Sequence, residues 1–386
     1  MCGKAQGYRT RPGGRLMDWR IAYLLGLITA FLTLFVLSFK NRKVSFFRPS
    51  PKKDVMAKAV EYRLSMGPHI VAVGGGTGLS TLLLGLKSFT RNITAVVAVT
   101  DEGGSSGRLR QEWGVLPPGD VRNCIVALAE NDNALRNILD FRFDRGDLSG
   151  HSLGNLILLA VTELSGDFRV AVEEMNHLLA IRGKVLPVTT EAVSLIAETV
   201  DGQLCRGELQ ISSCGKNLKD IWLEPRDARP LTDVIRAIEE ADLIVMGPGS
   251  LFTSVLPNLL LPKVAQKIQE SPLPRVYVAN LMSQPGETDG MNILHHLEWV
   301  ERAVKAVPDY VVVNNGSIPE ALLQAYLNEG AVPLYLDESQ RERILEKGCH
   351  IIEGNYVKVY EESVVRHDGQ GLSETLMRIC RDLKEV

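Results

Sequence analysis

Aromatic side chains are scarce in this sequence of 386 residues, at 6% of the total, and no two cysteines have C-x-x-C spacing. The six cysteines are far apart, which excludes a zinc ribbon or a thioredoxin-type motif and favours reduced thiols in a cytosolic protein. The sequence also lacks low-complexity blocks and internal repeats. A hydrophobic content of 45% excludes a disordered chain, and the length suffices for two ordinary domains or one large α/β domain.

Acidic residues are almost missing from the first 53 positions, which contain eleven Lys or Arg and a single acid, Asp18. The remaining residues carry 32 basic and 45 acidic side chains. An acidic folded part repels the phosphate backbone of nucleic acids, so we expect no nucleic-acid partner. The excess of positive charge belongs to the N-terminal segment alone.

An uncharged run of nineteen residues, 21–39, lies within this basic segment. As a helix rising about 1.5 Å per residue, it would nearly cross a hydrocarbon core of about 30 Å. A signal peptide usually has a shorter apolar core and a small-x-small cleavage site, whereas this run passes directly into Lys40. We therefore predict an N-terminal part, residues 1–53, with one transmembrane helix at about 20–39 and a linker, followed by a folded domain at 54–386.

The orientation of this helix is set by basic residues on its two sides, which are nearly equal in number. Met17 offers a second start codon that would leave only Arg20 before the span. Basic residues favour the cytoplasmic side of a membrane. We predict a single-pass protein of the cell membrane with its folded domain in the cytoplasm.

The first glycine-rich turn follows an apolar run at residues 69–73 and precedes a helical pattern of leucines. In a strand–turn–helix unit, backbone N–H groups and the helix dipole can bind a phosphate. A Walker A loop is excluded because Gly85-Leu86-Lys87 breaks its spacing. The alternative is a tight turn that uses glycine for steric reasons alone. The predicted phosphate ligands are Gly74, Gly75, Gly76, Thr77 and Gly78.

The apolar run 93–100 is typical of a strand buried on both faces of a parallel sheet, and it leads into an acidic, glycine-rich segment. Asp101 follows the first glycines by about 25 residues, near where a dinucleotide fold places its ribose-binding carboxylate. Such a set of polar residues indicates a pocket rather than a plain turn. The predicted ligand-binding residues are Asp101, Gly103, Gly104, Ser105 and Ser106, and Asp101 is also a candidate metal ligand.

Two further polar segments precede helical patterns. Asp120 is either the N-cap of the helix that follows it or a functional carboxylate, and Asn123 is a second candidate ligand. Residues 150–154 match the G-x-S-x-G nucleophile elbow of α/β-hydrolases, but the charged segment before them cannot be the buried strand that the elbow requires. We favour a polar loop that leads into a helix, with Ser152 and Asn155 as ligand donors.

A second strand–glycine–helix unit covers residues 241–256, and Gly247, Gly249 and Ser250 are its predicted ligand-binding residues. Two such units at one sheet edge suit a ligand with a diphosphate or two anionic ends. Further short apolar runs at 275–280 and 309–315 alternate with helical patterns. This alternation predicts an α/β fold with a Rossmann-related, open and mostly parallel sheet, whose carboxyl edge binds the ligand.

Six motifs occur in order along the chain, at residues 74–80, 101–110, 117–123, 150–155, 247–254 and 284–290. On these motifs the chain resembles the gluconeogenesis-factor (YvcK-type) family, which is homologous to the 2-phospho-L-lactate transferases of coenzyme F420 synthesis. The resemblance covers about residues 67–386 and implies a CofD-like fold. Met291 departs from the family pattern, which has an aromatic residue after Thr288-Asp289-Gly290.

The resemblance implies a non-catalytic regulator that binds a UDP-sugar, notably UDP-N-acetylglucosamine. It also implies support of gluconeogenic growth, cell-wall synthesis and bacterial cell shape. For the membrane anchor, our hypothesis is that it places the protein beside cell-wall synthesis proteins as partners, and we expect a homo-oligomer. The transferase relatives bind a nucleotide-activated donor and a divalent metal, for which Asp101 is the matching carboxylate and Mg²⁺ the expected ion. A metal-dependent transferase is therefore the alternative function. A third possible function, that of a dinucleotide-dependent oxidoreductase, is supported only by the first glycine turn and Asp101.

Overall fold

The computed structural model describes residues 51–130, 133–214, 218–361 and 363–383. The described residues from Val60 onward form one compact unit, and helix α2 (Pro51–Ser65) begins before that unit and ends within it. The predicted transmembrane segment, 20–39, lies outside the described residues. Within the described ranges, every helix is too short or too polar to cross a membrane.

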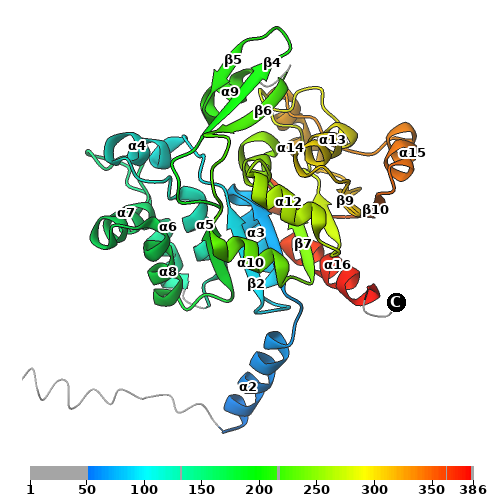
Figure 1. Ribbon diagram of the computed structural model, residues 1–386. Helices are drawn as coiled ribbons and strands as arrows, with labels where there is room; N and C mark the ends of the chain where they lie inside the picture. The colour runs from blue at the N-terminus through cyan, green and yellow to red at the C-terminus, as the bar shows by residue number, and fades with distance from the viewer. Residues whose placement is uncertain (1–50, 131–132, 215–217, 362, 384–386) are drawn as a thin grey trace, which may run out of the picture. The chain divides into compact units, whose positions relative to one another are not determined.

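A seven-stranded sheet forms the centre of this unit (Figure 1). All of its strand pairs are parallel, in the order β10-β9-β8-β7-β1-β2-β3. Its strands are β1 (Ile70–Gly74), β2 (Ile93–Val97), β3 (Lys184–Pro187), β7 (Leu243–Met246), β8 (Arg275–Val278), β9 (Tyr310–Asn314) and β10 (His350–Gly354). The prediction of a Rossmann-related, mostly parallel sheet is confirmed.

Central strands are apolar at nearly every position, with Thr94 of β2 as an exception, because both faces of the sheet are covered. All residues of β1, β2 and β7 are buried. Val71 and Val73 belong to the hydrophobic core on one face, whereas Ile70 and Ala72 belong to the core on the other. Helical crossovers place helices on both faces of a parallel sheet, so its strands appear in the sequence as continuous apolar runs.

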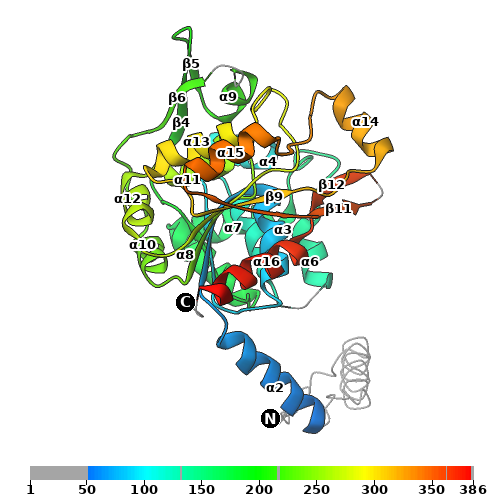
Figure 2. The same ribbon diagram turned by 90° about the vertical axis from the view of Figure 1, so that its right-hand side faces the viewer.

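Helices form a layer on each face (Figures 1 and 2). One layer contains α3 (Gly76–Leu86), α5 (Gly119–Leu128), α7 (Leu153–Ser165), α8 (Phe168–Leu178) and α16 (Gly369–Asp382). The other contains α10 (Thr232–Glu239), the π-helix η2 (Leu251–Val255), α11 (Leu256–Leu259), α12 (Pro262–Glu270), α13 (Ile293–Val304) and α15 (Glu338–Glu346). The remaining described helices are α4 (Gly104–Trp113), α6 (Asn133–Asp140), α9 (Glu208–Cys214) and α14 (Glu320–Asn328).

The path of the chain through the sheet reverses between β1 and β7. Strands β2 and β3 follow β1 on one side, and the chain then returns to place β7 on the other side of β1. Ligands of open α/β sheets bind at such a switch point, outside the carboxyl ends of the strands. The two glycine-rich turns follow β1 and β7, so both lie at the switch point.

Two smaller antiparallel sheets complete the unit. Strands β4 (Ser194–Thr199), β5 (Leu204–Arg206) and β6 (Leu218–Glu224) form one sheet, and β11 (Val357–Tyr360) and β12 (Val364–His367) form the other. Helix α14 lies beside the second sheet (Figure 2), where Val365 N–H donates to Tyr326 Oη at 3.1 Å. A disulfide between Cys205 and Cys214 corrects the expectation of reduced thiols. The two cysteines are nine residues apart, so no short cysteine motif in the sequence indicated this bond.

Candidate functional site

A cavity of about 490 Å³ lies at the switch point. Both glycine-rich turns line it, together with the loop after β8, helix α14 and strand β12. The lining residues from the turns include Gly75, Gly76, Thr77, Gly78, Gly249 and Ser250. Gly74 and Gly247 lie next to these residues at the strand ends. The structure therefore brings the two predicted turns to one cavity.

The two turns touch each other through their backbones. A Cβ atom on Gly78 would lie 2.7 Å from the carbonyl oxygen of Pro248 and 3.0 Å from the nitrogen of Gly249. Gly247 N–H donates to Val73 O at 2.8 Å. Only glycine at position 78 leaves room for this contact. The steric interpretation of glycine therefore holds for Gly78, whatever the turns bind.

A buried carboxylate occupies the N-terminus of α3. Asp120 accepts a hydrogen bond from the backbone N–H of Gly76, and a Cβ on Gly75 would lie 2.5 Å from Asp120 Oδ2. Burial, with a smaller contribution from Asp101, raises the pKa of Asp120 to about 7. Asp120 does not cap its own helix, because the N-cap of α5 is Pro118. The N-cap interpretation is wrong, and the carboxylate instead joins α5 to the first glycine turn.

The second turn also has a buried carboxylate at the N-terminus of the helix that follows it. Glu287 Oε1 accepts a hydrogen bond from Phe252 N–H at 2.9 Å, at the start of η2. Thr253 N–H and the Ser250 hydroxyl also bond to this carboxylate. Burial raises the pKa of Glu287 to about 7. Side chains of the protein itself thus occupy both helix N-termini, and a phosphate in the cavity must use other donors.

The cavity offers such donors from several elements. Thr77 and Ser254 carry hydroxyl groups, whereas the Ser250 hydroxyl already bonds to Glu287, and Arg366 is the one Lys or Arg among the residues that line the cavity. No motif in the sequence marked Arg366. Its neighbour His367 donates from Nε2 to Ala279 O, 3.1 Å away, and burial lowers the pKa of His367 to about 4. At neutral pH this histidine is uncharged and joins β12 to the end of β8.

Three carboxylates meet beside the first turn. Glu208, the first residue of α9, accepts a hydrogen bond from Glu102 N–H at 2.8 Å and bonds to the side chain of Asp101. Burial raises the pKa of Glu208 to about 8, and the charges of Asp101 and Asp120 act in the same direction. Glu208 follows Glu102 by 106 residues and belongs to no glycine motif, so its sequence position gave no sign of this contact.

The acidic cluster fits a divalent ion only with help from a ligand. No group of three or more His, Cys, Asp or Glu side chains in the described ranges is arranged to hold a metal ion. Mg²⁺ is often held by one or two carboxylates, with phosphate oxygens and water completing its shell. Asp101 Oδ1 already accepts a hydrogen bond from Gly103 N–H at 2.8 Å. Asp101 and Asp120 could thus hold Mg²⁺ together with a bound diphosphate.

Four of the predicted ligand donors have partners inside the protein. Ser105 Oγ lies 2.9 Å from His151 Nδ1 and accepts from Asn155 Nδ2 at 3.0 Å. Ser152 is the N-cap of α7, and Ser106 Oγ accepts from Gly119 N–H at 3.0 Å. All of these side chains are buried. They hold α4, α5 and α7 together, and none lines the cavity.

The remaining predicted residues surround this network. Gly103 is the N-cap of α4, and Gly104 has φ of +44°, which favours glycine. Asn123 is half-buried on α5. Ser152 pairs with Arg142 only through an isolated bridge, so no strand leads into it. The absence of this strand in the described segment 141–152 excludes the hydrolase elbow.

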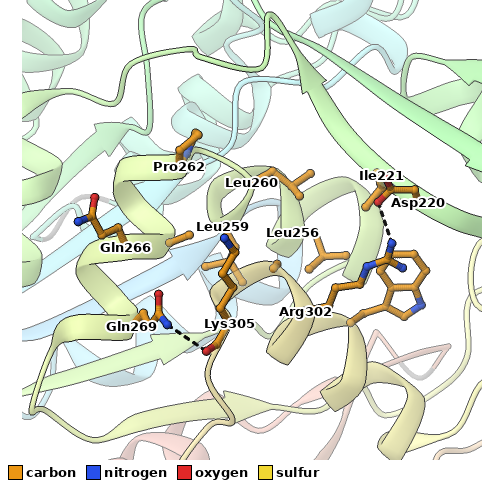
Figure 3. A pocket seen from close by; sticks show the side chains of 13 residues that line it. Asp220, Ile221, Leu256, Leu259, Leu260, Pro262, Gln266, Gln269, Arg302 and Lys305 are labelled. Carbon is orange, nitrogen blue, oxygen red and sulfur yellow. Dashed lines mark hydrogen bonds and ion pairs between the residues drawn. The ribbon is translucent and has the colours of Figure 1, made fainter.

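Other cavities lie away from the glycine turns. One of about 470 Å³ is lined by residues of α11, α12 and α13 (Figure 3). Arg302 donates to Asp220 at 3.1 Å at its rim, and none of the predicted site residues lines it. Met291 lines a third cavity, of about 450 Å³, with Phe252 and Trp299. Position 291 is therefore not part of the lining of the switch-point cavity.

Comparison with known proteins agrees with this architecture. The family model for 2-phospho-L-lactate transferase CofD matches residues 70–357. A Bacillus subtilis protein named gluconeogenesis factor is 42% identical over 317 residues, which cover 82% of this chain and 99% of that protein. A protein of the same name from Halalkalibacterium halodurans is 43% identical over 311 residues, covering 80% and 95%.

Solved structures give the same result. A crystal structure of a UPF0052-family protein from Bacillus halodurans superimposes with a TM-score of 0.76 at 43% identity, covering 81% of this chain and 99% of that one. The resemblance inferred from the six motifs is thereby confirmed. The chain belongs to the CofD family, and its similar relatives include proteins named gluconeogenesis factor.

Proposed function

We propose that the protein binds a UDP-sugar, UDP-N-acetylglucosamine, in the switch-point cavity and acts as a non-catalytic regulator. One observation carries this proposal: glycine turns from the neighbouring strands β1 and β7 line a single cavity of about 490 Å³. Cavities of about 300–1,000 Å³ accept ligands of small-molecule size. In the cell, the regulator would support gluconeogenic growth, cell-wall synthesis and cell shape. The names of the relatives support the gluconeogenic role.

The diphosphate of this ligand would lie between the two turns. Thr77 and Ser254 line the same cavity as Arg366. Arginine is suited to phosphate because its guanidinium donates two parallel hydrogen bonds. The buried carboxylates Asp120 and Glu287 would not contact the phosphates directly, because like charges repel. They hold the two turns in place instead.

The alternative is a metal-dependent transferase that uses a nucleotide-activated donor. Asp101 and Asp120 support it, since two carboxylates beside a diphosphate suit Mg²⁺. The regulator is favoured because the hydroxyl–imidazole pair in this region, Ser105 and His151, is buried and does not line the cavity. Among the residues that line the cavity, Ser250 bonds to the carboxyl of Glu287, but the N–H groups of Phe252 and Thr253 already hold that carboxyl, so it serves as the cap of η2.

Calorimetric titration with UDP-N-acetylglucosamine, with and without Mg²⁺, tests the proposal. We expect binding of one ligand per chain and recovery of the intact UDP-sugar from the same sample. Transfer or cleavage of the sugar in the presence of Mg²⁺ would instead establish the transferase. Absence of heat and of a thermal shift would show that the ligand is not this UDP-sugar. UDP and N-acetylglucosamine, titrated separately, show which half of the ligand contributes more affinity.

We further propose that residues 20–39 anchor the protein in the cell membrane, with the folded domain in the cytoplasm beside cell-wall synthesis proteins. The uncharged run between two basic segments supports this anchor. Cell fractionation of the full chain and of a variant lacking residues 1–53 tests it. We expect the full chain in the membrane fraction and the shortened chain in the supernatant. Equal distribution of both would contradict the anchor. Sedimentation of purified protein tests the expected homo-oligomer.

A further inference from the structure

Helix α9 connects the acidic cluster to the loop that supplies Glu287. At its first residue, Glu208 bonds to Glu102 N–H and to the side chain of Asp101. Farther along, the carbonyl oxygen of Ser212 lies so close to Gly286 that a Cβ on this glycine would collide with it. Gly286 immediately precedes Glu287. A movement of α9 would therefore act on both sides of the switch point.

The Cys205–Cys214 disulfide closes α9 onto strand β5. The two Cα atoms are 6.8 Å apart, and Glu208 lies inside the loop that the bond closes. The helix has only seven residues, and helices of this length are unstable without further contacts. Backbone hydrogen bonds at its start include Gly207 N–H to Leu195 O at 2.7 Å. The disulfide is the covalent restraint at its other end.

The two cysteines differ in access to solvent. Cys205 is 1% exposed, whereas Cys214 is partly exposed at the end of α9. Thiol–disulfide exchange needs an accessible sulfur, so Cys214 is the residue that a small thiol or disulfide reaches first. Disulfides of cytosolic proteins are usually transient and redox-sensing. A bond in this place would thus respond to the redox state of the compartment predicted for this domain.

We propose that Cys205 and Cys214 form a reversible thiol–disulfide switch that sets the position of Glu208 beside Asp101. In the oxidising direction, the Cys214 thiolate attacks a small disulfide such as glutathione disulfide, forms a mixed disulfide and releases one glutathione thiolate. The Cys205 thiolate then attacks the Cys214 sulfur and releases the second glutathione. The two thiol protons pass to the released thiolates. Glutathione reverses both steps.

Reduction removes the restraint at the end of α9 and allows Glu208 to move away from Asp101 and Asp120. Because the pKa of Glu208 is about 8, this carboxyl is largely protonated at pH 7, and its departure takes a hydrogen bond away from Asp101 rather than a negative charge away from the turn. The Asp101 carboxylate beside the first glycine turn then loses its contact with α9. The switch itself does not depend on the identity of the ligand, and in this respect it is independent of the proposed function.

Redox equilibration of the full chain tests the switch. The protein is incubated in mixtures of reduced and oxidised glutathione without denaturant, and free thiols are counted by mass after maleimide labelling. Hydrogen exchange is then measured on the oxidised and reduced forms. We expect interconversion in both directions, and amides of residues 207–214 that exchange at least about tenfold faster after reduction. A bond that glutathione cannot reduce, or exchange that is equal in both forms, would overturn the proposal.

Cysteine variants separate the switch from general destabilisation. Cys214→Ala should give fast exchange at residues 207–214 in oxidising buffer, and Cys349→Ala, which removes a buried thiol outside the disulfide, should keep the difference between the two redox forms. If Cys205→Ala fails to fold because Cys205 is buried, Cys214→Ala still gives the answer. Titration of both redox forms with UDP-N-acetylglucosamine then measures the effect on the site. If neither redox form binds UDP-N-acetylglucosamine, the proposed function is wrong. The hydrogen-exchange measurements still test the thiol–disulfide switch in that case.

Discussion

The turn after β1 and the turn after β7 lie against each other, and each places a buried carboxylate at the start of a helix. Asp120 reaches the first turn from α5, and both burial and Asp101 raise its pKa. Glu287 reaches the second turn from the loop after β8, and burial alone raises its pKa. The first carboxylate therefore belongs to an acidic cluster, whereas the second is a cap for η2. Similar glycine patterns thus support two different arrangements.

This difference indicates beside which turn a bound ligand can change the ionisation of carboxylates. On the β1 side, Asp101, Asp120 and Glu208 influence one another, so a cation or a change in one carboxylate affects the others. On the β7 side, hydrogen bonds from Phe252 and Thr253 fix Glu287. We expect substitutions on the β1 side to alter pH dependence and binding, and substitutions on the β7 side to alter mainly stability.

Asp120→Asn should have the largest effect, on the pH dependence of stability. The carboxyl has a folded pKa of about 7 against 3.8 in the unfolded chain, so the folded state binds more protons between these values. Its contribution to the free energy of unfolding falls by up to about 4 kcal/mol as pH rises from 4 to 7. The variant lacks this loss, so its stability relative to the natural protein should rise over that range. Urea unfolding at pH 4.5 and 8 measures the difference, and parallel pH curves would contradict it.

Gly78→Ala should separate the two turns. The new Cβ would meet the backbone of Pro248 and Gly249, which cannot move as a flexible side chain can. We expect a loss of about 3 kcal/mol in the free energy of unfolding, and loss of UDP-sugar binding. Gly74→Ala is the matched control, because its Cβ would have ordinary contacts at 3.7 Å. Equal stability of the two variants would show that the contact between the turns is unimportant.

Glu287→Ala should destabilise the β7 side without changing the acidic cluster. It leaves the N–H groups of Phe252 and Thr253 without their acceptor, which costs about 2 kcal/mol. Glu287→Gln keeps an acceptor oxygen and should cost less than about 1 kcal/mol. Both variants are compared at pH 5, where the natural carboxyl is protonated because its pKa is about 7. A larger loss for Gln than for Ala would refute the capping role.

Arg366→Ala should have the smallest effect on the fold and a selective effect on the ligand. The side chain is exposed and lines the cavity, so we expect a Kd for UDP-N-acetylglucosamine about tenfold higher, with stability unchanged within about 0.5 kcal/mol. Arg378→Ala on α16 is the control, since this exposed arginine lies outside the lining of the cavity. Titration at two salt concentrations measures the charge contribution. Identical affinities of the two variants would remove Arg366 from the proposed site.

Much of the sheet could be predicted because its strands are buried on both faces. The apolar run 93–100 contains β2, and the runs at 241–246 and 275–280 contain β7 and β8. Parallel strands of one sheet end at the same edge, so the two strand–glycine–helix units in the sequence predicted two glycine turns at one edge. Periodicity could not give the strand order, which depends on the long excursion from β3 through the small sheet to β7.

The site was predictable only where it uses local motifs. Ser105, Ser152 and Asn155 have the residue types of a ligand site, but they bond to one another or to the backbone in a buried network. A polar network and a binding site need the same side chains, so one sequence cannot separate them. Glu208 begins helix α9 and Arg366 lies on β12 of an antiparallel pair, and neither residue belongs to a glycine-rich motif. Their contacts depend on tertiary packing alone.

The position of β12 has a consequence for synthesis of the protein on the ribosome. The glycine turns and most of the residues that line the cavity precede β12 in the chain, so they are made before Arg366 and His367. A nascent chain that stops before β12 contains all seven strands of the central sheet but lacks Arg366 and helix α16. Ligands stabilise only the forms that bind them. The ligand would therefore stabilise chains that include β12 more than chains truncated before residue 364.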